Sequence, residues 1–394
     1  MNNLILYDEI TSIISNNYIF KDNQKDIWLS NVEKYRTNIP NLTDKDFLST
    51  VNRLLLTLND AHTKISTLNA VSKIFDIEFI WISNKIIILP NLLGYNCDLV
   101  GGELFEVNDI NVYELFETFK KDMINYPIGI IKEDFIKYIK TQRDIDYLSI
   151  KVKKNNSFIV DTIKKKSLLE IKSKYSIDET NCMLSPIVFK EIDKNILLIK
   201  IFSFRFKNLS DYFFKNNNLI NSNKTVVFDI RGNRGGFINE TKDVTSLIIN
   251  KDVTLEYKIL SNVNSRGEDV IIHSSNNSMF SNKKLFILCD EYTMSSAEFI
   301  FMQSLKICFP AIKIIGQQTA GLSGQAKIFN LSKKFILQVT TKKYIDKNNN
   351  EIKSGMYPNL LIDRNLDYYM NKTDPYIDTI KYLCSNLNKE GDLQ

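Results

Sequence analysis

The sequence has few of the residues that build metal centres and disulfide frameworks. Its 394 residues contain two histidines, and its five cysteines are odd in number and never form a CxxC pair. We therefore expect no metal site, no cofactor and no disulfide framework. Cys289, which ends the apolar run KLFILC, is expected to be a small core residue. A general base of the imidazole type has two candidates in this chain, His62 and His273.

Long apolar runs and tracts of one charge are also absent. No apolar run approaches the ~20 residues that span a bilayer. The first residues, MNNLILYDEITSII, lack the basic region and the small-residue cleavage site of a signal peptide. The 51 Lys and Arg against 46 Asp and Glu give a net charge of +5 that is spread along the chain. We expect a soluble, cytoplasmic chain whose partners are neither membranes nor nucleic acids.

The spacing of apolar residues divides the chain into three regions, because 394 residues suggest two or three compact units. Helical spacing predicts helices near 3–17 and 25–38 and a third in NLTDKDFLSTVNRLLLTL, with Thr43 as its N-cap. Between 67 and 182 the pattern changes to short strands with one or two helices. From 183 onwards strands and helices alternate, which is typical of an α/β core with parallel strands.

The stretch DEYTMSSAEF, residues 290–299, has two interpretations. Ser295-x-x-Glu298 has the spacing of a capping box, in which the two side chains satisfy backbone donors at the start of a helix. Alternatively, Ser295 is a nucleophile at a helix N-terminus, where the positive end of the helix dipole favours an alkoxide. The stretch alone favours the cap, so a nucleophile needs a base and an oxyanion site elsewhere in the chain.

The stretch TVVFDIRGNRGGF brings a strand into a loop with three glycines, Gly232, Gly235 and Gly236. Such a loop requires close backbone approach or positive φ angles. A plain strand–turn–helix connection is one interpretation, and a phosphate-binding loop is weakly indicated, since neither GKS/T nor GxGxxG follows. A third interpretation is an oxyanion site built from free backbone N–H groups.

Four motifs, LNDAHT, DIRGNRGG, YTMSSAE and GQQTAG, occur in an order and spacing that resembles the tail-specific (C-terminal-processing) serine peptidases and their tricorn-core and retinoid-binding-repeat relatives. The resemblance implies an α/β fold with a spiral ββα-type (crotonase/Clp-like) catalytic core. The stretch LVGGELFEVNDINVYEL resembles part of the family's PDZ-like module. The expected domains are an N-terminal helical segment (1–66), a degenerate PDZ-like domain (67–182) and the peptidase core (183–394).

The resemblance also implies roles for individual residues. Ser295 matches the family's nucleophile, and His62 matches the base of the branch that uses a Ser/His pair. The lysine-dependent branch has a lysine near the position of Leu322, so a Ser/Lys dyad is not expected. The pKa of an ordinary histidine, ~6.5, suits a general base.

The remaining roles concern charge stabilisation. The backbone N–H groups of Gly235 or Gly236 and of Ser296 match the family's oxyanion site. The carboxylate that orients the imidazole is assigned to Glu351 in NNNEIKSGMYPNLLI, by analogy with tricorn-like members.

Three other residues receive structural roles. Asp60 and Asp229 are expected to cap turns or to pair with Arg231. His273 is expected to lie at the surface.

The sequence therefore predicts a serine peptidase that cleaves peptide or protein substrates, bound in extended form, through an acyl-enzyme on Ser295. Homo-oligomer formation is left open. Two other classes also stay open: a non-catalytic protein of the same fold that binds a peptide or apolar ligand, and an acyl hydrolase with a similar oxyanion loop. Active-site serine probes separate the binding protein from an enzyme, and turnover of peptides against thioesters separates the two enzymes.

Overall fold

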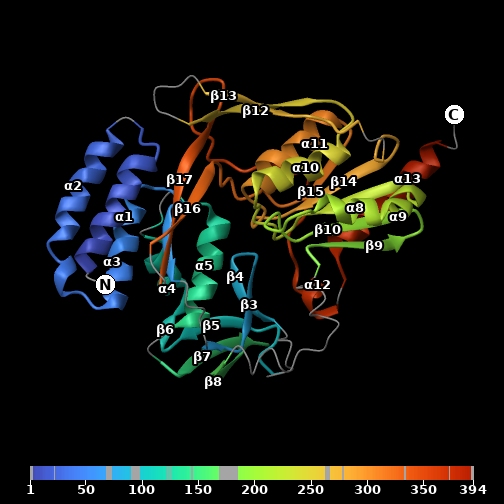
Figure 1. The fold of residues 1–394 in the computed structure, drawn as a ribbon. Helices are drawn as coiled ribbons and strands as arrows, with labels where there is room; N and C mark the ends of the chain where they lie inside the picture. The colour runs from blue at the N-terminus through green and yellow to red at the C-terminus, as the bar shows by residue number, and fades with distance from the viewer. Residues whose placement is uncertain are drawn as a thin grey trace.

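The described part of the chain forms a mixed α/β fold around three β-sheets (Figure 1). No helix within it has the length and apolar character needed to cross a bilayer. The computed structural model describes residues 3–21, 23–67, 73–89, 98–121, 123, 126–142, 145–167, 185–261, 267–276, 279–331, 334–371 and 373–391.

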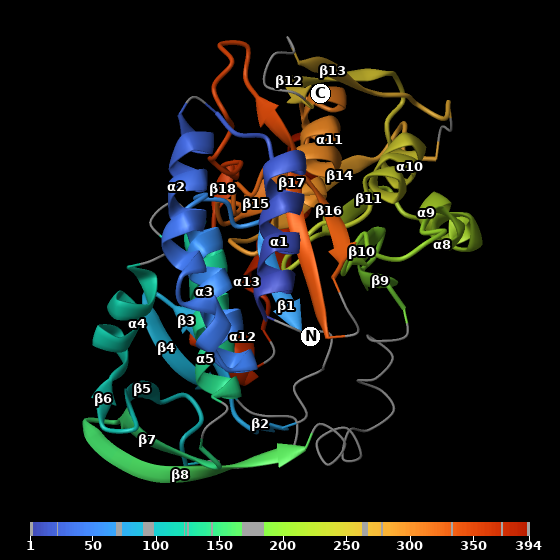
Figure 2. The same ribbon diagram turned by 60° about the vertical axis from the view of Figure 1, so that its left-hand side comes forward.

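The chain begins with three helices that lie side by side next to strand β17 (Figures 1 and 2). All three were predicted from apolar spacing, and Thr43 is the N-cap of the third, its hydroxyl accepting the Asp46 N–H at 3.2 Å. Their apolar faces and β17 enclose one hydrophobic core, which includes Phe47 and Leu337. The elements are α1 (Asn3–Asn17), α2 (Gln24–Arg36), the short 3-10 helix η1 (Ile39–Asn41) and α3 (Asp44–Leu56).

A five-stranded sheet joins this helical segment to the second half of the chain. Its order is β1-β17-β12-β13, and β16 also pairs with β17. Strand β1 runs antiparallel to β17, with Ile65 opposite Leu337, so the residues after His62 are fixed against the C-terminal half. The strands are β1 (Lys64–Thr67), β12 (Val253–Leu260), β13 (Glu268–Ile272), β16 (Gln325–Asn330) and β17 (Phe335–Ile345).

The central sheet has the parallel strands expected of an α/β core. Its order is β18-β15-β14-β11-β10-β9, and every neighbouring pair is parallel except β10 with β9. All five residues of β11 are buried, as for a strand covered on both faces. Its strands are β9 (Ile187–Asp193), β10 (Ile196–Ile201), β11 (Thr225–Asp229), β14 (Lys284–Cys289), β15 (Lys313–Gly316) and β18 (Leu360–Leu361).

Helices cover both faces of the central sheet (Figure 1). Residues of α10, η2 and α11 share one apolar core with the sheet, and residues of α13 share a second. The helices are α8 (Ser210–Lys215), α9 (Asn217–Ser222), α10 (Ile238–Ile248), the π-helix η2 (Ala297–Met302), α11 (Gln303–Cys308), α12 (Leu366–Asn371) and α13 (Pro375–Gly391).

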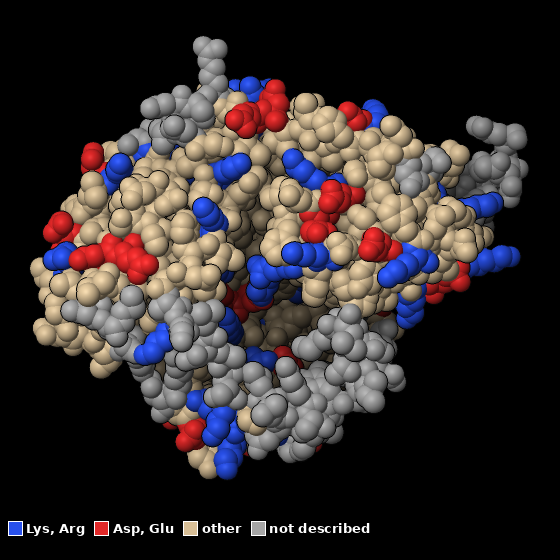
Figure 3. Space-filling model, viewed as in Figure 1, with Lys and Arg blue, Asp and Glu red and all other residues tan. Residues whose placement is uncertain are grey.

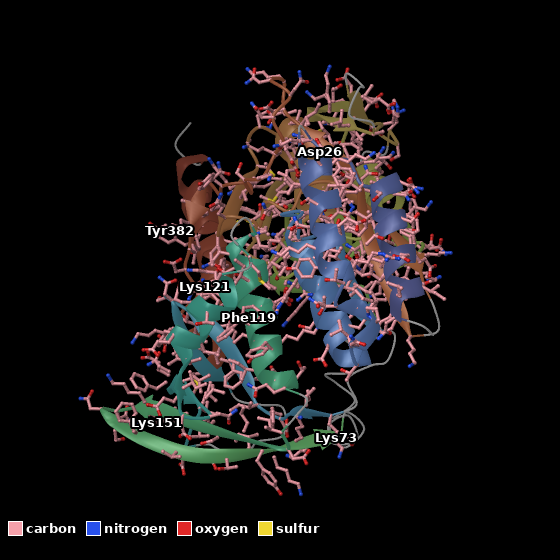
Figure 4. All side chains as sticks on the ribbon, turned by 90° about the vertical axis from the view of Figure 1, so that its left-hand side faces the viewer. Asp26, Lys73, Phe119, Lys121, Lys151 and Tyr382 are labelled. Carbon is pink, nitrogen blue, oxygen red and sulfur yellow. The ribbon has the colours of Figure 1, made fainter. Side chains whose placement is uncertain are left out.

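The middle of the chain forms a seven-stranded sheet of order β2-β8-β7-β5-β4-β3, with β6 beside β5. Helices α4 and α5 pack on it, and Phe119 of α4 is labelled in Figure 4. Its ring lies 5.4 Å from the ring of Phe135 of α5. The elements are β2 (Lys73–Phe75), β3 (Glu78–Ile82), β4 (Lys85–Leu89), β5 (Glu103–Val107), β6 (Ile110–Asn111), α4 (Val112–Lys120), α5 (Ile128–Thr141), β7 (Tyr147–Lys154) and β8 (Ser157–Ser167).

Candidate active site

Ser295 lies in a sharp turn between strand β14 and helix η2. Its φ angle is +58°, in the left-handed region that a residue with a Cβ rarely adopts. Such strain persists where the surroundings fix the backbone, and it is frequent at functional sites. The helix that follows begins as a π-helix, a deviation that the apolar pattern of SSAEFIFMQSLKI did not predict.

Half of the predicted capping box is present. The Ser295 N–H donates to Oε1 of Glu298 at 3.1 Å, as the box requires. The second bond of the box would run from the Glu298 N–H to the Ser295 hydroxyl. This N–H donates instead to the Ser295 carbonyl, at 3.1 Å. The N-cap position of η2 is Ser296, whose side chain makes no capping bond, and the bond that Ser295 makes to Glu298 uses its backbone N–H. Glu298 thus fixes the Ser295 backbone and leaves its hydroxyl outside the cap.

The second oxygen of Glu298 binds the GQQTAGLSG loop. Glu298 is fully buried, and its Oε2 accepts the Gly321 N–H at 3.0 Å. Burial raises the pKa of this carboxyl to about 7, while bonds from Thr319 and from backbone groups, including Leu322, act in the opposite direction. One carboxylate therefore holds the serine turn and this loop together.

His62 lies at the helix-to-strand junction predicted from the sequence, between α3 and β1. Asp60 builds the turn, since Oδ1 accepts the His62 N–H at 3.0 Å and Oδ2 accepts the Thr63 hydroxyl at 2.6 Å. The Tyr126 hydroxyl donates to the Asp60 carbonyl at 3.1 Å. The prediction that Asp60 caps a turn is confirmed.

The His62 ring is buried next to the loop that Glu298 holds. Burial lowers the pKa of His62; the Asp60 charge and the Ser323 backbone raise it, and Lys64 lowers it. The ring Nδ1 has no hydrogen-bond partner within the described residues. Because Ser323 follows Gly321 by two residues, the loop reaches Glu298 with one residue and His62 with another. The loop thus links the glutamate that holds the Ser295 turn to the His62 ring.

The two glycines predicted for the oxyanion site differ in whether the backbone N–H already has an acceptor. The Gly235 N–H donates to Asn233 Oδ1 at 2.8 Å, so it is occupied. A Cβ on Gly235 would lie 2.8 Å from the Ser296 nitrogen, and a Cβ on Gly236 would lie 2.1 Å from the Phe204 carbonyl carbon. Both positions therefore need glycine. Among the described residues, no acceptor is present for the N–H groups of Gly236 and Ser296.

Glu351 lies away from direct contact with the imidazole. Its carboxylate is 3.5 Å from Lys343 Nζ and 3.8 Å from Lys21 Nζ, and no hydrogen bond joins it to His62. The Ser323 hydroxyl donates to the carbonyl of Ile352, the next residue, so the Glu351 segment adjoins the loop at His62. The assignment of Glu351 as the orienting carboxylate stays a prediction.

Two further predictions are confirmed. Asp229 accepts two bonds from the Arg231 guanidinium, at 3.0 and 2.8 Å. The side chain of His273 is 76% exposed, with Nδ1 2.8 Å from Asp252.

The cysteines were predicted to be structural, and Cys289 can be checked directly. Cys289 is fully buried, as predicted, and burial raises the pKa of its thiol. Cys97 and Cys182 lie outside the described residues. Within the described ranges, no group of three or more His, Cys, Asp or Glu residues is arranged to hold a metal ion.

Sequence reasoning missed three basic residues at this site, Lys64, Arg205 and Arg234. Arg205 and Lys64 both act on the pKa of His62, and Arg234 acts on that of Lys64. Lys64 and Arg234 stand beside predicted site residues in the sequence, but Arg205 carries no such signal.

Comparisons with known proteins agree with the motifs. Residues 195–362 match the model of peptidase family S41. The structure is similar to that of mature CPAF, with a TM-score of 0.74 at 12% identity over 99% of this chain and 98% of that chain. It is also similar to the photosystem II D1 C-terminal processing protease, with a TM-score of 0.54 at 16% identity over 92% and 94% of the two chains. The chain matches no curated protein in sequence.

The tricorn protease shares the fold over a smaller part of its own length. Its TM-score is 0.51 at 16% identity, covering 98% of this chain and 37% of that chain. The fold and the family match define the protein as a serine-type peptidase. Residues 195–362, which carry three of the four motifs, thus match peptidase family S41, and the resemblance to the tail-specific peptidases is confirmed.

Proposed function

We propose that the protein cleaves peptides or proteins through an acyl-enzyme on Ser295, with His62 as general base. The observation that carries this proposal is the GQQTAGLSG loop, which binds Glu298 through Gly321 and contacts His62 through Ser323. Ser295 attacks the scissile carbonyl carbon while His62 takes the hydroxyl proton. His62 then gives that proton to the leaving amine, and water hydrolyses the ester by the same route.

The oxyanion of each tetrahedral intermediate is assigned to the N–H groups of Gly236 and Ser296. Both groups lack an acceptor among the described residues, and Ser296 directly follows the nucleophile. Donors fixed before the reaction stabilise the developing charge without reorganisation, and each contributes several kcal/mol, about 3. The Gly235 N–H is left out of this role because Asn233 occupies it. Gly235 contributes instead by allowing close backbone approach.

A neutral His62 is the form that accepts a proton, and its surroundings favour that form. Burial is the main cause of its lowered pKa, and the positive charges of Lys64 and Arg205 act in the same direction. Asp60 opposes them and stabilises the imidazolium that forms during each step. Glu351 is kept as the proposed orienting carboxylate, since its segment adjoins Ser323.

We also propose the finer domain assignments. The sheet β2–β8 with helices α4 and α5 corresponds to the degenerate PDZ-like domain of 67–182, and the central sheet with its helices to a spiral ββα-type core. The stretch LVGGELFEVNDINVYEL forms β5, β6 and the start of α4, which supports the first assignment. An extended substrate adds to a sheet edge in such a domain. Homo-oligomer formation and a cytoplasmic location remain predictions.

Covalent labelling tests the proposal directly. A fluorophosphonate is expected to label the wild-type protein on Ser295, and a denatured protein substrate is expected to be cleaved at neutral pH. Lactacystin, which is bound in a structure of CPAF, is a second probe. Labelling without turnover of peptides but with turnover of thioesters would favour an acyl hydrolase. Absence of both labelling and turnover would favour a binding protein.

A further inference from the structure

Asp290 is a buried carboxylate that directly follows strand β14 and begins the nucleophile turn, residues 290–296. Its Oδ1 accepts the Tyr292 N–H of this turn at 3.1 Å. The same oxygen accepts the Gly232 N–H at 2.9 Å, and Gly232 belongs to the glycine loop, residues 231–236. One carboxylate oxygen therefore joins the loop and the turn that carry the proposed oxyanion donors.

Thr293 and Met294 add further hydrogen bonds at the same junction. The Thr293 hydroxyl donates to the Ile230 carbonyl at 2.9 Å and accepts the Asp290 N–H at 3.1 Å. The Met294 N–H donates to the Asn233 carbonyl at 3.0 Å, so the contact continues up to the nucleophile. The oxyanion N–H groups stand at the other ends of the two segments. Their separation is therefore set by this junction.

The second oxygen of Asp290 binds an arginine from the C-terminal part of the chain. Arg364, in the segment between β18 and α12, donates from Nη2 to Asp290 Oδ2, and its guanidinium carbon lies 4.7 Å from the centre of the Tyr292 ring. Figure 3 shows Lys and Arg side chains spread over the surface of one face of the molecule, which is their ordinary place. Arg364 is only 9% exposed, so it has exchanged hydration for contacts with Asp290 and Tyr292.

This buried pair has a geometric consequence for the carboxylate. Because Arg364 holds Oδ2, the carboxylate keeps one orientation, and Oδ1 stays directed at the two backbone N–H groups. Without the arginine, Asp290 would be a buried charge with no countercharge, a strongly unfavourable state. The carboxylate would then have to move toward water or take up a proton, and either change weakens its hold on the loop and the turn.

We propose that Arg364 is a positioning residue of the peptidase reaction, which acts through Asp290 to hold the N–H groups of Gly236 and Ser296 at the separation that the tetrahedral intermediate requires. The proposal rests on the peptidase function proposed above. The oxyanion forms only after attack, so a change in this separation weakens transition-state stabilisation and leaves the binding of the uncleaved peptide unchanged. Arg364 should therefore act on kcat and not on KM.

The variant Arg364→Gln tests the proposal by steady-state kinetics with a fluorogenic peptide. We expect kcat to fall about 10–100-fold while KM stays within about 2-fold of wild type. The rate of fluorophosphonate labelling should fall by a similar factor, since the phosphonyl oxygen occupies the oxyanion site. A merely structural role would lower thermal stability and leave the kcat of the folded enzyme unchanged. Wild-type kcat in a folded Arg364→Gln overturns the proposal.

Two further variants serve as comparisons. Arg364→Lys keeps the charge but loses the planar guanidinium, so its kcat should lie between those of wild type and Arg364→Gln. Arg36→Gln is the control, because it also removes an arginine paired with an aspartate, Asp8 at 2.8 Å, but at the surface of the helical segment. It should keep wild-type kcat and labelling.

A second link makes folding of the Arg364 variants expected. Arg231 donates to the two carboxylate oxygens of Asp374 at 3.1 and 2.8 Å, so the C-terminal segment stays attached to the glycine loop when Arg364 is changed. Thermal unfolding and circular dichroism check that each variant is folded before its kinetics are compared.

Amide hydrogen exchange separates this inference from the catalytic one. Exchange of segments 230–237 and 290–297 is followed by mass spectrometry in wild type, Arg364→Gln and Arg36→Gln. We expect both segments to exchange about 10-fold faster in Arg364→Gln alone. This outcome supports the positioning role even where the wild-type protein neither cleaves peptides nor reacts with a fluorophosphonate, which would defeat the peptidase proposal alone. Unchanged exchange of both segments in Arg364→Gln overturns the inference.

Discussion

Glu298 accepts a hydrogen bond from the Ser295 backbone N–H at 3.1 Å with one oxygen and from the Gly321 N–H at 3.0 Å with the other. This relationship answers the question that the sequence raised about SSAE. Glu298 forms its bond of the capping box, whereas the Ser295 hydroxyl does not form the other bond. The turn with φ +58° at Ser295 is therefore stabilised by a side chain other than its own.

The variant Glu298→Gln should lower kcat about 10²-fold while the protein remains folded. An amide has one acceptor oxygen, so either the Ser295 N–H or the Gly321 N–H would face an NH₂ group, and an unsatisfied buried donor costs about 1–3 kcal/mol. Steady-state kinetics and fluorophosphonate labelling measure the effect. Glu256→Gln, an exposed change on β12, is the matched control. A Glu298→Gln enzyme with wild-type kcat would show that this link does not position the nucleophile.

Glu298 should also affect stability against pH. Its pKa in the folded protein is about 7, above the ordinary value of 4.5, so the folded state holds a proton that the unfolded state has lost between these pH values. The contribution of Glu298 to the free energy of unfolding is therefore fully present below pH ~4.5. It decreases as the pH rises to ~7, by about 3 kcal/mol at most. Urea unfolding of wild type and Glu298→Gln at pH 5 and 7.5 measures the difference. Identical pH slopes in both proteins would contradict it.

Ser295→Ala should abolish covalent labelling and reduce activity by roughly 10⁴–10⁶-fold. Because the N-cap position of η2 is Ser296 and not Ser295, the loss of stability should be below the ~1 kcal/mol typical of a lost N-cap. Ser296→Ala is the control, since alanine keeps the backbone N–H assigned to the oxyanion. Its buried hydroxyl accepts a bond from Thr241 at 2.9 Å, so this variant should lose about 1 kcal/mol of stability and keep its labelling. A label on Ser296, or one that persists in Ser295→Ala, would disprove the assignment.

The pH dependence of kcat/KM should follow the neutral form of His62. Burial lowers its pKa, so activity should rise with pH through an apparent pKa below the ordinary ~6.5. Stability should fall as pH drops below ~6.5, because the unfolded state then gains a proton that the buried ring does not. His62→Ala should lose roughly 10³-fold or more in activity, and His273→Ala should behave like wild type. A rise only above pH ~9 would instead indicate a lysine base.

Local patterns predicted the three N-terminal helices, the buried parallel strands and the junction at His62, but not α8, α9, α12 or α13. Apolar spacing and a Thr43 cap define α3, and the apolar run VVF lies at the centre of β11, so short-range information was sufficient there. The partners of Glu298 were hidden, since Gly321 lies in another segment and only the tertiary fold brings the two together.

The oxyanion loop shows the same limit of sequence information. Three glycines indicated close backbone approach, which is confirmed at Gly235 and Gly236. The choice between them depends on the Asn233 side chain, whose orientation no spacing rule gives. The position of Arg205 beside Gly236 likewise depends on a single β-bridge between distant segments.

The last prediction concerns the carboxylate that supports His62. If Glu351 orients the ring, Glu351→Gln should lower kcat by about 10²–10⁴-fold with little change in KM, because the imidazole loses its tautomer and the imidazolium its countercharge. The same change leaves the buried Lys343 without its partner at 3.5 Å, which itself destabilises the fold.

Lys343→Gln separates these two effects, because it breaks the same ion pair and keeps the Glu351 carboxylate. We expect Lys343→Gln to lose stability but to retain much more activity than Glu351→Gln. Asp60→Asn is the second comparison, since Asp60 is the carboxylate whose charge acts most strongly on His62. If Glu351→Gln keeps the wild-type kcat and a folded Asp60→Asn loses most of it, Asp60 is the carboxylate that orients His62. Equal losses in Glu351→Gln and Lys343→Gln would show that the ion pair is structural.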